Sequence, residues 1–136
     1  MEAVWIEGGE PRYRTIGGTE PRGICGSGLI DLLAELRRTG RMTELGVYPG
    51  GGTHFSFVPQ RGMTLSRADI SALAQAKAAN YCGQLIVLRR YGVPLDGVKT
   101  LYLAGGFANY VNAENAAAIL ATTGSHAGDT LRLVKA

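Results

Sequence analysis

Apolar residues recur at helical spacing in a first segment near the N-terminal end of the chain. Four leucines fall at i, i+3, i+4 and i+7 and predict one face of a helix: Leu29, Leu32, Leu33 and Leu36. Ser27 is the expected N-cap of this helix. The basic pair Arg37–Arg38 and then Gly40 mark its C-terminal end, where basic side chains offset the helix dipole.

A second and longer helix is predicted over 66–91. Ser66 and Asp69 form a variant of the capping box, and Gly92 and Pro94 end the helix. One stripe of this helix is apolar: Ile70, Leu73, Ala74, Ala78, Tyr81, Leu85 and Leu88. Its many alanines indicate close packing against a neighbour: Ala72, Ala74, Ala76, Ala78 and Ala79.

Shorter runs of strand-like composition lie between and beyond these helices. Residues 3–7 and 12–16 predict a hairpin around the turn Gly8–Pro11, and 54–58 predict a further strand. Residues 98–104 read as a buried strand that runs into Gly105–Gly106. Asn112 is the expected cap of a short helix over 113–121, and 131–134 form a last strand. The pattern as a whole predicts an α/β fold with a small β-sheet packed against the long helix.

Composition and charge narrow the class of protein. Of the 136 residues 46% are hydrophobic and 18% are charged, so a packed core is expected and wholesale disorder is not. The net charge of +3 is scattered, and the two adjacent arginine pairs stand at helix ends, which argues against nucleic-acid binding. Because no apolar run approaches the roughly 20 residues of a membrane helix and the acidic N-terminal segment has no secretory pattern, we expect a cytoplasmic protein without a membrane partner.

Few residues suggest catalysis or metal binding. Cys25 and Cys82 are far apart, have no metal-ligand spacing and are expected to be buried free thiols. An iron–sulfur centre usually needs four cysteines. No Ser/His/Asp set or pair of carboxylates stands at a catalytic spacing, so the sequence predicts neither a catalytic residue nor a metal ligand within this chain.

Two glycine-rich turns carry the clearest chemistry. Gly26–Ser27–Gly28 opens the first helix, and Gly105–Gly106 follows a strand a few residues before the Asn112 helix. Helix N-termini attract phosphate, and glycine lets a ligand touch the backbone. Phe107 could supply an apolar wall for a base. The alternative is that both turns serve only packing, and we regard this alternative as stronger for residues 26–28.

Lys77 is the other candidate. It falls near the middle of the apolar stripe of the long helix, where a lysine must extend to solvent, pair with an acid or meet a ligand. A cation or hydrogen-bond donor that faces a nucleotide is one interpretation. Extension to solvent at the edge of a small core is the other, and the sequence favours neither.

The order of the motifs resembles the C-terminal region of the reductive activators of corrinoid proteins. The resemblance covers residues 15–121 and rests on four segments taken together: Thr15–Gly18, Pro21–Asp31, Asp69–Ala79 and Leu101–Tyr110. Members of this family are iron–sulfur proteins whose ATPase domain is related to actin, sugar kinases and the large heat-shock chaperones, with a ribonuclease H-like fold. The resemblance therefore implies part of one lobe of an actin-like ATPase.

The resemblance also implies a mechanism and a site. A [2Fe–2S] domain passes an electron to an inactive Co(II) corrinoid, and ATP drives the step. Gly105, Gly106 and Phe107 match the adenosine motif, Lys77 lies on the helix beside the adenine, and Gly26–Ser27–Gly28 opens a helix near the cleft. The implied ligands are ATP or ADP with Mg²⁺ in the full-length protein, and the implied partner is a corrinoid protein or methyltransferase.

Several family features do not occur in these 136 residues. The two acidic phosphate motifs and the ferredoxin-like domain are absent, and the usual continuation after the Asn112 helix is replaced by Gly124–Gly128. We therefore expect residues 1–136 to be a single-domain fragment, inactive by itself, that supplies the adenosine side of a nucleotide site. Exposed apolar surface on such a fragment could support a homo-oligomer. Two other functions remain open: an activator of another enzyme, such as a dehydratase, or a docking module that binds no nucleotide.

Overall fold

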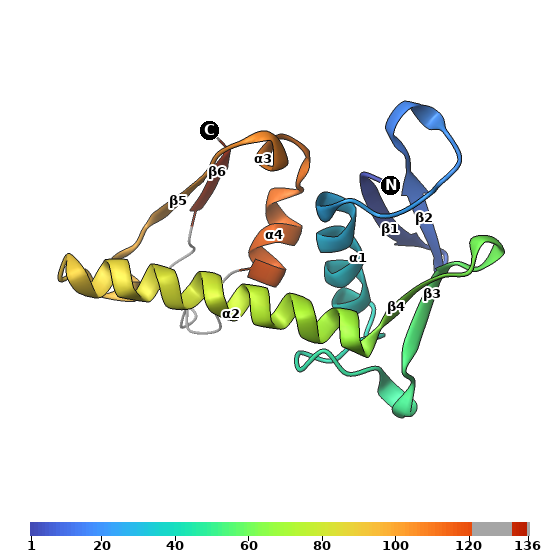
Figure 1. Cartoon of the computed structure of the whole chain (residues 1–136), viewed down its shortest axis with the longest axis horizontal. Coiled ribbons are helices and arrows are strands. Elements are labelled where there is room, and N and C mark those ends of the chain that lie inside the picture. The colour runs from blue at the N-terminus through green and yellow to red at the C-terminus, as the bar shows by residue number, and fades with distance from the viewer. Residues whose placement is uncertain (121–131, 136) are drawn as a thin grey trace.

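The computed structural model describes residues 1–120 and 132–135. Within them the strands are paired in three two-stranded sheets: β1 (Ala3–Glu7) with β2 (Glu10–Arg14), β3 (His54–Val58) with β4 (Met63–Ser66), and β5 (Thr100–Leu103) with β6 (Arg132–Lys135). The first two sheets are antiparallel and the third is parallel. The helices are α1 (Gly26–Arg38), α2 (Arg67–Arg90), α3 (Gly106–Tyr110) and α4 (Ala113–Leu120). The α/β class is as predicted. Figure 1 shows α2 running along the long axis, with α1 and α4 side by side above it.

The first hairpin turns earlier than the sequence pattern predicts. Its second strand was expected over 12–16, but β2 begins at Glu10, which pairs with Glu7. Gly8 and Gly9 have positive φ angles of 58° and 84°, so the two glycines alone make the turn. Pro11 is accommodated inside β2, because an edge strand does not need every N–H group for pairing.

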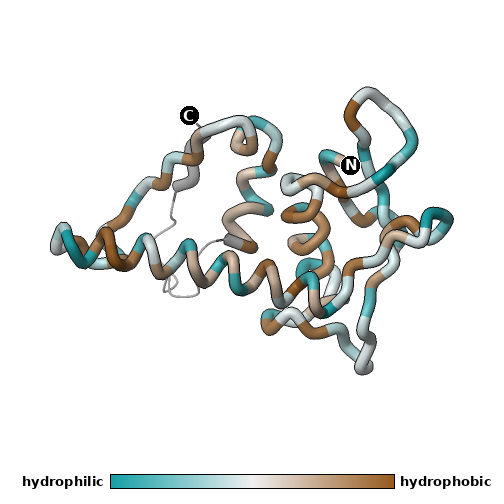
Figure 2. Tube along the Cα trace, viewed as in Figure 1, coloured by the Kyte–Doolittle hydropathy of each residue, from teal (hydrophilic) through white to brown (hydrophobic). Residues whose placement is uncertain are grey.

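The main hydrophobic core surrounds α1. The predicted leucine face is confirmed: Leu32 and Leu36 are fully buried, Leu33 is nearly so, and Leu29 lies at the edge. The core is completed by residues from the first two sheets, the loop between them and the start of α2: Met1, Val4, Met42, Tyr48, Phe57, Val58, Leu65 and Ile70. Figure 2 shows this concentration of hydrophobic residues along α1. A smaller cluster joins the other side of α1 to the C-terminal elements through Ile30, Val111 and Ala116.

Two buried carboxylates of α1 bind the outer edge of β1. Asp31 Oδ2 accepts a hydrogen bond from the Val4 N–H at 3.4 Å, and Glu35 Oε2 accepts one from the Ile6 N–H at 2.7 Å. The spacing matches, since one helical turn and two strand residues both advance by about 6 Å. Asp31 Oδ1 also accepts from Asn115 Nδ2 at 2.7 Å, which ties α1 to α4. The helix thus satisfies backbone groups that β2 cannot reach.

The Glu35 carboxylate makes stability depend on pH. Two hydrogen bonds from the Arg38 guanidinium lower the pKa of Glu35 more than burial raises it, and the Ile6 N–H lowers it further. A lowered pKa in the folded state means that the contribution of Glu35 to stability is present above pH 4.5, the ordinary value, and is lost as pH falls below it. We therefore expect Glu35→Gln to flatten the acid limb of unfolding free energy against pH, measured by urea titration.

The matched control for Glu35→Gln is Glu44→Gln. This substitution removes the same formal charge from a carboxyl group that is 86% exposed in its side chain. The control should reproduce the wild-type slope below pH 4.5. An equal slope in both variants would contradict the assignment of the acid sensitivity to Glu35.

The second sheet leads directly into the long helix. β3 is confirmed as predicted, but β4 was missed, because no strand was predicted between residues 54–58 and the long helix. Gly62 adopts a left-handed conformation and returns the chain as β4. The capping box is confirmed: the Asp69 N–H donates to Ser66 Oγ at 3.1 Å, and the Ser66 N–H donates to Asp69 Oδ2 at 2.8 Å.

The helix α2 is packed less closely than its alanines predict. Ile70 is buried, and the rest of the large side chains in the predicted stripe are half-buried: Leu73, Tyr81, Leu85 and Leu88. All five alanines are exposed, and so is Cys82, which was wrongly predicted to be in the core. The physical reason is that α2 extends beyond α1 and β4 (Figure 1), and Ile70 near its start is its one buried residue within the described structure.

The C-terminal elements contain one helix that the pattern did not predict. β5 ends at Leu103, and α3 begins only three residues later, at Gly106. Asn112 caps α4 as predicted, because its Oδ1 accepts from the Asn115 N–H at 3.0 Å. β6 covers residues 132–135, close to the predicted 131–134. Leu131 and the Gly124–Gly128 segment lie outside the described residues.

Candidate functional site

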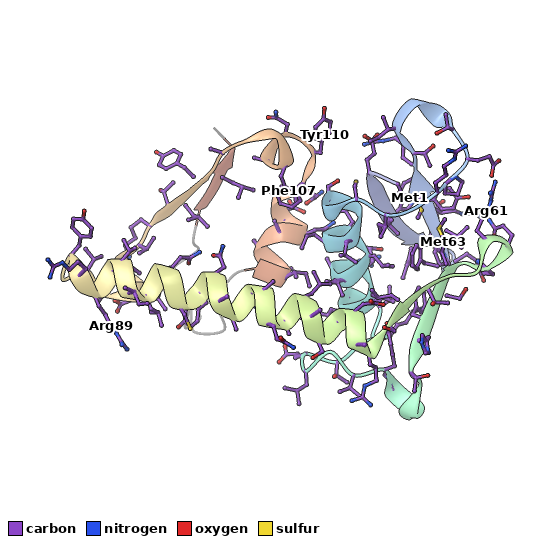
Figure 3. The ribbon with its side chains drawn as sticks, viewed as in Figure 1. Met1, Arg61, Met63, Arg89, Phe107 and Tyr110 are labelled. Atoms are coloured by element: carbon purple, nitrogen blue, oxygen red, sulfur yellow. The ribbon has the colours of Figure 1, made fainter. Side chains whose placement is uncertain are left out.

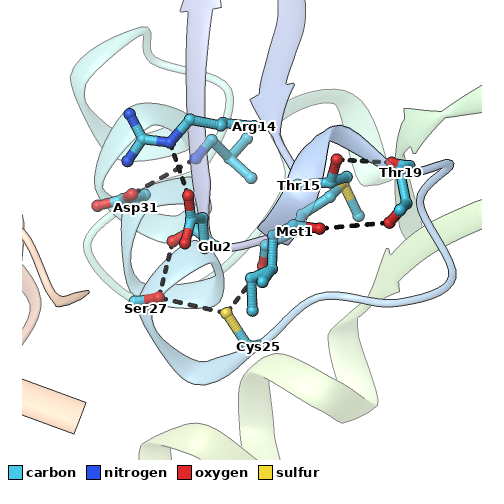
Figure 4. A network of polar contacts seen from close by, with 10 residues as sticks. Met1, Glu2, Arg14, Thr15, Thr19, Cys25, Ser27 and Asp31 are labelled. Atoms are coloured by element: carbon cyan, nitrogen blue, oxygen red, sulfur yellow. Dashed lines mark hydrogen bonds and ion pairs between the residues drawn. The ribbon is translucent and has the colours of Figure 1, made fainter. Parts of the chain in front are cut away.

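The N-terminus of α1 is built differently from the sequence prediction. Cys25, not Ser27, holds the N-cap position, and Ser27 lies inside the first turn. The Ser27 hydroxyl donates to the Glu2 carbonyl oxygen at 2.7 Å, so it is committed to the chain segment beside it rather than to capping. The Cys25 N–H and thiol both donate to the Met1 carbonyl oxygen, at 3.0 and 2.9 Å (Figure 4). These bonds attach the start of α1 to the start of the chain.

This arrangement lowers the pKa of the Cys25 thiol. Partial burial raises the pKa, but several groups favour the thiolate and outweigh it. They are the Ser27 hydroxyl 3.3 Å from the sulfur, the backbone N–H groups of Gly28 and Ser27, and the positive charge of the N-terminal amine. The thiol that was expected to be simply buried is therefore half-buried and electrostatically distinct.

The turn after β5 places its backbone in the open. Gly105 is the N-cap of α3 with a φ of 98°, a conformation that side chains rarely adopt, and Gly106 is the first residue of α3. A Cβ atom built at either position would meet no atom within 4 Å. Both glycines are exposed. Within the described residues, no neighbouring side chain covers this turn.

The two predicted glycine turns meet at one cavity of about 280 Å³. Gly26 and Ser27 form its wall on α1, and Gly106 and Phe107 form its wall on α3. The Phe107 ring lies against Gly26, since a Cβ at position 26 would be 2.9 Å from the ring. The remaining lining residues are Glu2, Ile16, Cys25 and Tyr110. Phe107 and Tyr110 both project from α3 (Figure 3). The cavity is mostly apolar, and its size is near the lower end for ligand pockets.

Three of the predicted site residues do not line this cavity. Gly28 is buried under the Met1 carbonyl oxygen, which would be 2.8 Å from a Cβ at that position. Gly105 shapes the turn but lies beside the cavity rather than on its wall. Lys77 lies half-buried on α2. The structure therefore brings together Gly26, Ser27, Gly106 and Phe107.

Sequence reasoning missed three lining residues: Glu2, Ile16 and Cys25, the last of which was expected to be only a buried thiol. Glu2 reaches the cavity because β1 lies beside the start of α1, a contact that no local pattern predicts. Ile16 did carry a signal, because a large apolar residue stands directly before two glycines in an otherwise polar loop. Tyr110, at the end of the segment Leu101–Tyr110, also lines the cavity and is 66% exposed.

Residues 1–120 and 132–135 contain no group of three or more His, Cys, Asp or Glu side chains that could hold a metal ion. No helix in the same part of the chain is both long and apolar enough to cross a membrane.

A match to a known protein family shows to which family the chain belongs. The model of the family described as "C-terminal domain of RACo the ASKHA domain" matches residues 1–123. The chain belongs to this family. The RACo C-terminal family is an ASKHA, or actin-like ATPase, family, so the resemblance that the motifs indicated is confirmed at the level of family and fold.

Two relatives are much longer proteins than this chain. A protein of Eubacterium limosum named "Corrinoid activation enzyme RamQ" is 29% identical over 140 residues, which cover 85% of this chain and 24% of that protein. A solved structure named "Reductive activator for corrinoid,iron-sulfur protein" shares 30% identity with a TM-score of 0.71, covering 98% of this chain and 24% of the other. This RACo-family chain thus spans about a quarter of the length of both relatives.

Proposed function

We propose that this chain supplies the adenosine side of an adenine nucleotide site in an ATP-dependent reductive activator of corrinoid proteins. The observation that carries the proposal is the cavity in which two glycine turns from distant parts of the sequence meet. Membership of the RACo C-terminal family and the names of the two relatives support the same function. In the full-length protein, ATP would drive electron transfer from an iron–sulfur domain to an inactive Co(II) corrinoid on a partner protein.

The cavity suits a base and sugar better than a triphosphate. Gly106 leaves the backbone accessible, and Phe107 offers an aromatic face on which a purine can stack. Among the described residues that line the cavity none is cationic, and Glu2 is acidic. We therefore assign the phosphates and Mg²⁺ to other parts of the full-length protein. The proposal does not use Gly28 or Lys77, which lie outside the cavity.

A titration of the ¹⁵N-labelled chain with ATP and ADP tests the proposal. We expect weak binding, with amide chemical-shift changes centred on Gly26, Ser27, Gly106 and Phe107. Shift changes confined to residues remote from both turns would contradict the site. Absence of binding by calorimetry and by chemical shift would contradict the function assigned to this chain.

The variant Gly106→Val gives the same test a sharper form. No atom lies within 4 Å of a Cβ at Gly106, so valine fits the fold but occupies the space that a nucleoside needs. We expect at least tenfold weaker ADP binding and an unchanged thermal midpoint. Gly83→Val is the control, because Gly83 is also an exposed helix residue with open space but lies on α2. Loss of the fold in Gly106→Val alone would show that the turn serves packing.

A further inference from the structure

Ile16 is an apolar side chain at the mouth of the cavity with no evident structural role. It lies in the turn Ile16–Gly18, which joins β2 to α1, and it is 69% exposed. Phe107, at 45% exposure, and Tyr110 stand at the same cavity on α3. Three exposed apolar side chains from segments about 90 residues apart thus gather at one opening, an arrangement that marks a binding surface more often than single exposed residues do.

The turn that carries Ile16 is held by bonds within itself. The Thr15 hydroxyl donates to the Thr19 carbonyl oxygen at 2.6 Å, and the Thr19 hydroxyl donates to the Ile16 carbonyl oxygen at 3.3 Å (Figure 4). Gly17 and Gly18 have φ angles of 70° and 66°, and a Cβ at either position would meet nothing within 4 Å. The turn therefore keeps its own shape while it stands clear of its neighbours.

Ile16 has space on two sides. Besides the first cavity it borders a second one of about 190 Å³, lined by Met1, Thr15, Thr19 and residues 20–23. The described contacts that hold the following part of this loop include the ion pair between Arg61 and Glu20 and the hydrogen bond from the Met1 amine to the Gly23 carbonyl oxygen at 2.6 Å. Both contacts lie beyond Thr19, so they leave the Ile16 side chain uncovered at the first cavity.

From this placement we infer that Ile16 is a further ligand-binding residue of the cavity. Its side chain covers a purine base that lies against Phe107. The inference rests on the proposed function and adds which part of the nucleotide the cavity recognises. An apolar side chain gains by covering the flat face of an uncharged heterocycle and gains nothing from phosphate. The Glu2 carboxylate, held by Arg14 Nε at 2.8 Å, is the charged group on the wall and disfavours phosphate. Recognition therefore falls on the nucleoside.

The chain offers a closely matched control for Ile16. Ile86, on α2, is 68% exposed and does not line the cavity. Alanine at either position removes the same atoms from an equally exposed site, so neither change should unfold the protein. A difference in ligand affinity between the two variants then reports the position of the side chain rather than its chemistry.

The experiment measures adenosine and ATP affinity for the whole chain, for Ile16→Ala and for Ile86→Ala. We expect the unsubstituted chain to bind adenosine and ATP within about threefold of each other. Ile16→Ala should bind both about tenfold more weakly, from the loss of apolar area covered by the base. Ile86→Ala should bind as the unsubstituted chain does. A nuclear Overhauser effect between the Ile16 methyl protons and the base protons of adenosine is expected as direct evidence.

The outcomes separate this inference from the proposed function. If the unsubstituted chain binds neither ligand, the proposed function is wrong and the inference falls with it. If it binds adenosine but Ile16→Ala and Ile86→Ala have equal affinities, the role of Ile16 alone is overturned. If ATP binds more than tenfold tighter than adenosine, the cavity recognises phosphate, and the nucleoside specificity is overturned.

Discussion

Replacing Leu32 with alanine should lower the free energy of unfolding by about 3 kcal/mol. Leu32 is fully buried at the centre of the cluster that joins α1 to the first two sheets and to the start of α2. Removal of its branched end both loses apolar burial and leaves a cavity that packed neighbours fill only in part. Because one cluster holds these elements together, the loss should appear as a shift of the whole urea transition, followed by circular dichroism.

The control for this substitution is Leu45→Ala. Leu45 is 90% exposed, so the same chemical change should alter stability by less than about 0.5 kcal/mol. A small effect in both variants would contradict the position of α1 in the core. A lower slope of the transition in Leu32→Ala would show instead that the elements unfold separately.

Alanine at the two helical glycines Gly28 and Gly83 should change stability in opposite directions. At Gly28 the new Cβ would lie 2.8 Å from the Met1 carbonyl oxygen and 3.2 Å from Ile24 Cγ1. The Met1 oxygen cannot retreat freely, because it accepts two hydrogen bonds from Cys25. Overpacking of this kind costs about 2 kcal/mol, which exceeds the gain of up to about 1 kcal/mol from helix propensity.

At Gly83 the same substitution brings the gain in helix propensity without any overpacking. A Cβ there would meet nothing within 4 Å, and the helix gains from the more restricted residue, so we expect an increase of about 0.5–1 kcal/mol. Thermal unfolding of both variants in one buffer provides the comparison. Stabilisation by Gly28→Ala would show that the segment at Met1 is not fixed against α1.

Elements whose signals lie within a few neighbouring residues could be predicted from the sequence. The leucine spacing of α1 and the capping box of Ser66 and Asp69 each reside within a few residues, and the structure confirms both. The family resemblance, carried by the order of several short motifs, is confirmed too. What was missed locally was short: β4 and α3 contain four and five residues, too few for a period to be visible.

Burial along α2 could not be predicted from its pattern. An apolar stripe shows which face of a helix would pack, but it does not show whether another element covers that face along its full length. The alanines and Cys82 were expected to be covered and are exposed within the described structure. Lys77 illustrates the same limit, because its half-buried position on α2 is consistent with extension to solvent and does not place it at the cavity.

The two halves of the candidate site could be predicted from the sequence, but the way in which they come together could not. Each glycine turn could be recognised from its own residues, and the opening at Gly106 is visible as open backbone. That Phe107 would lie against Gly26, about 80 positions away, depends on tertiary packing. The same packing reversed the role of Ser27, whose hydroxyl bonds to the Glu2 carbonyl oxygen instead of capping the helix.

The two carboxylates that bind β1 have a consequence for the behaviour of the protein in concentrated solution. An open strand edge is a template on which a foreign extended peptide can add, and such addition is the first step toward aggregates. Asp31 and Glu35 occupy the donors of Val4 and Ile6 that this addition would use. This edge of β1 is in this way closed to recruitment by another chain, and acidification that protonates Glu35 would weaken the closure at Ile6.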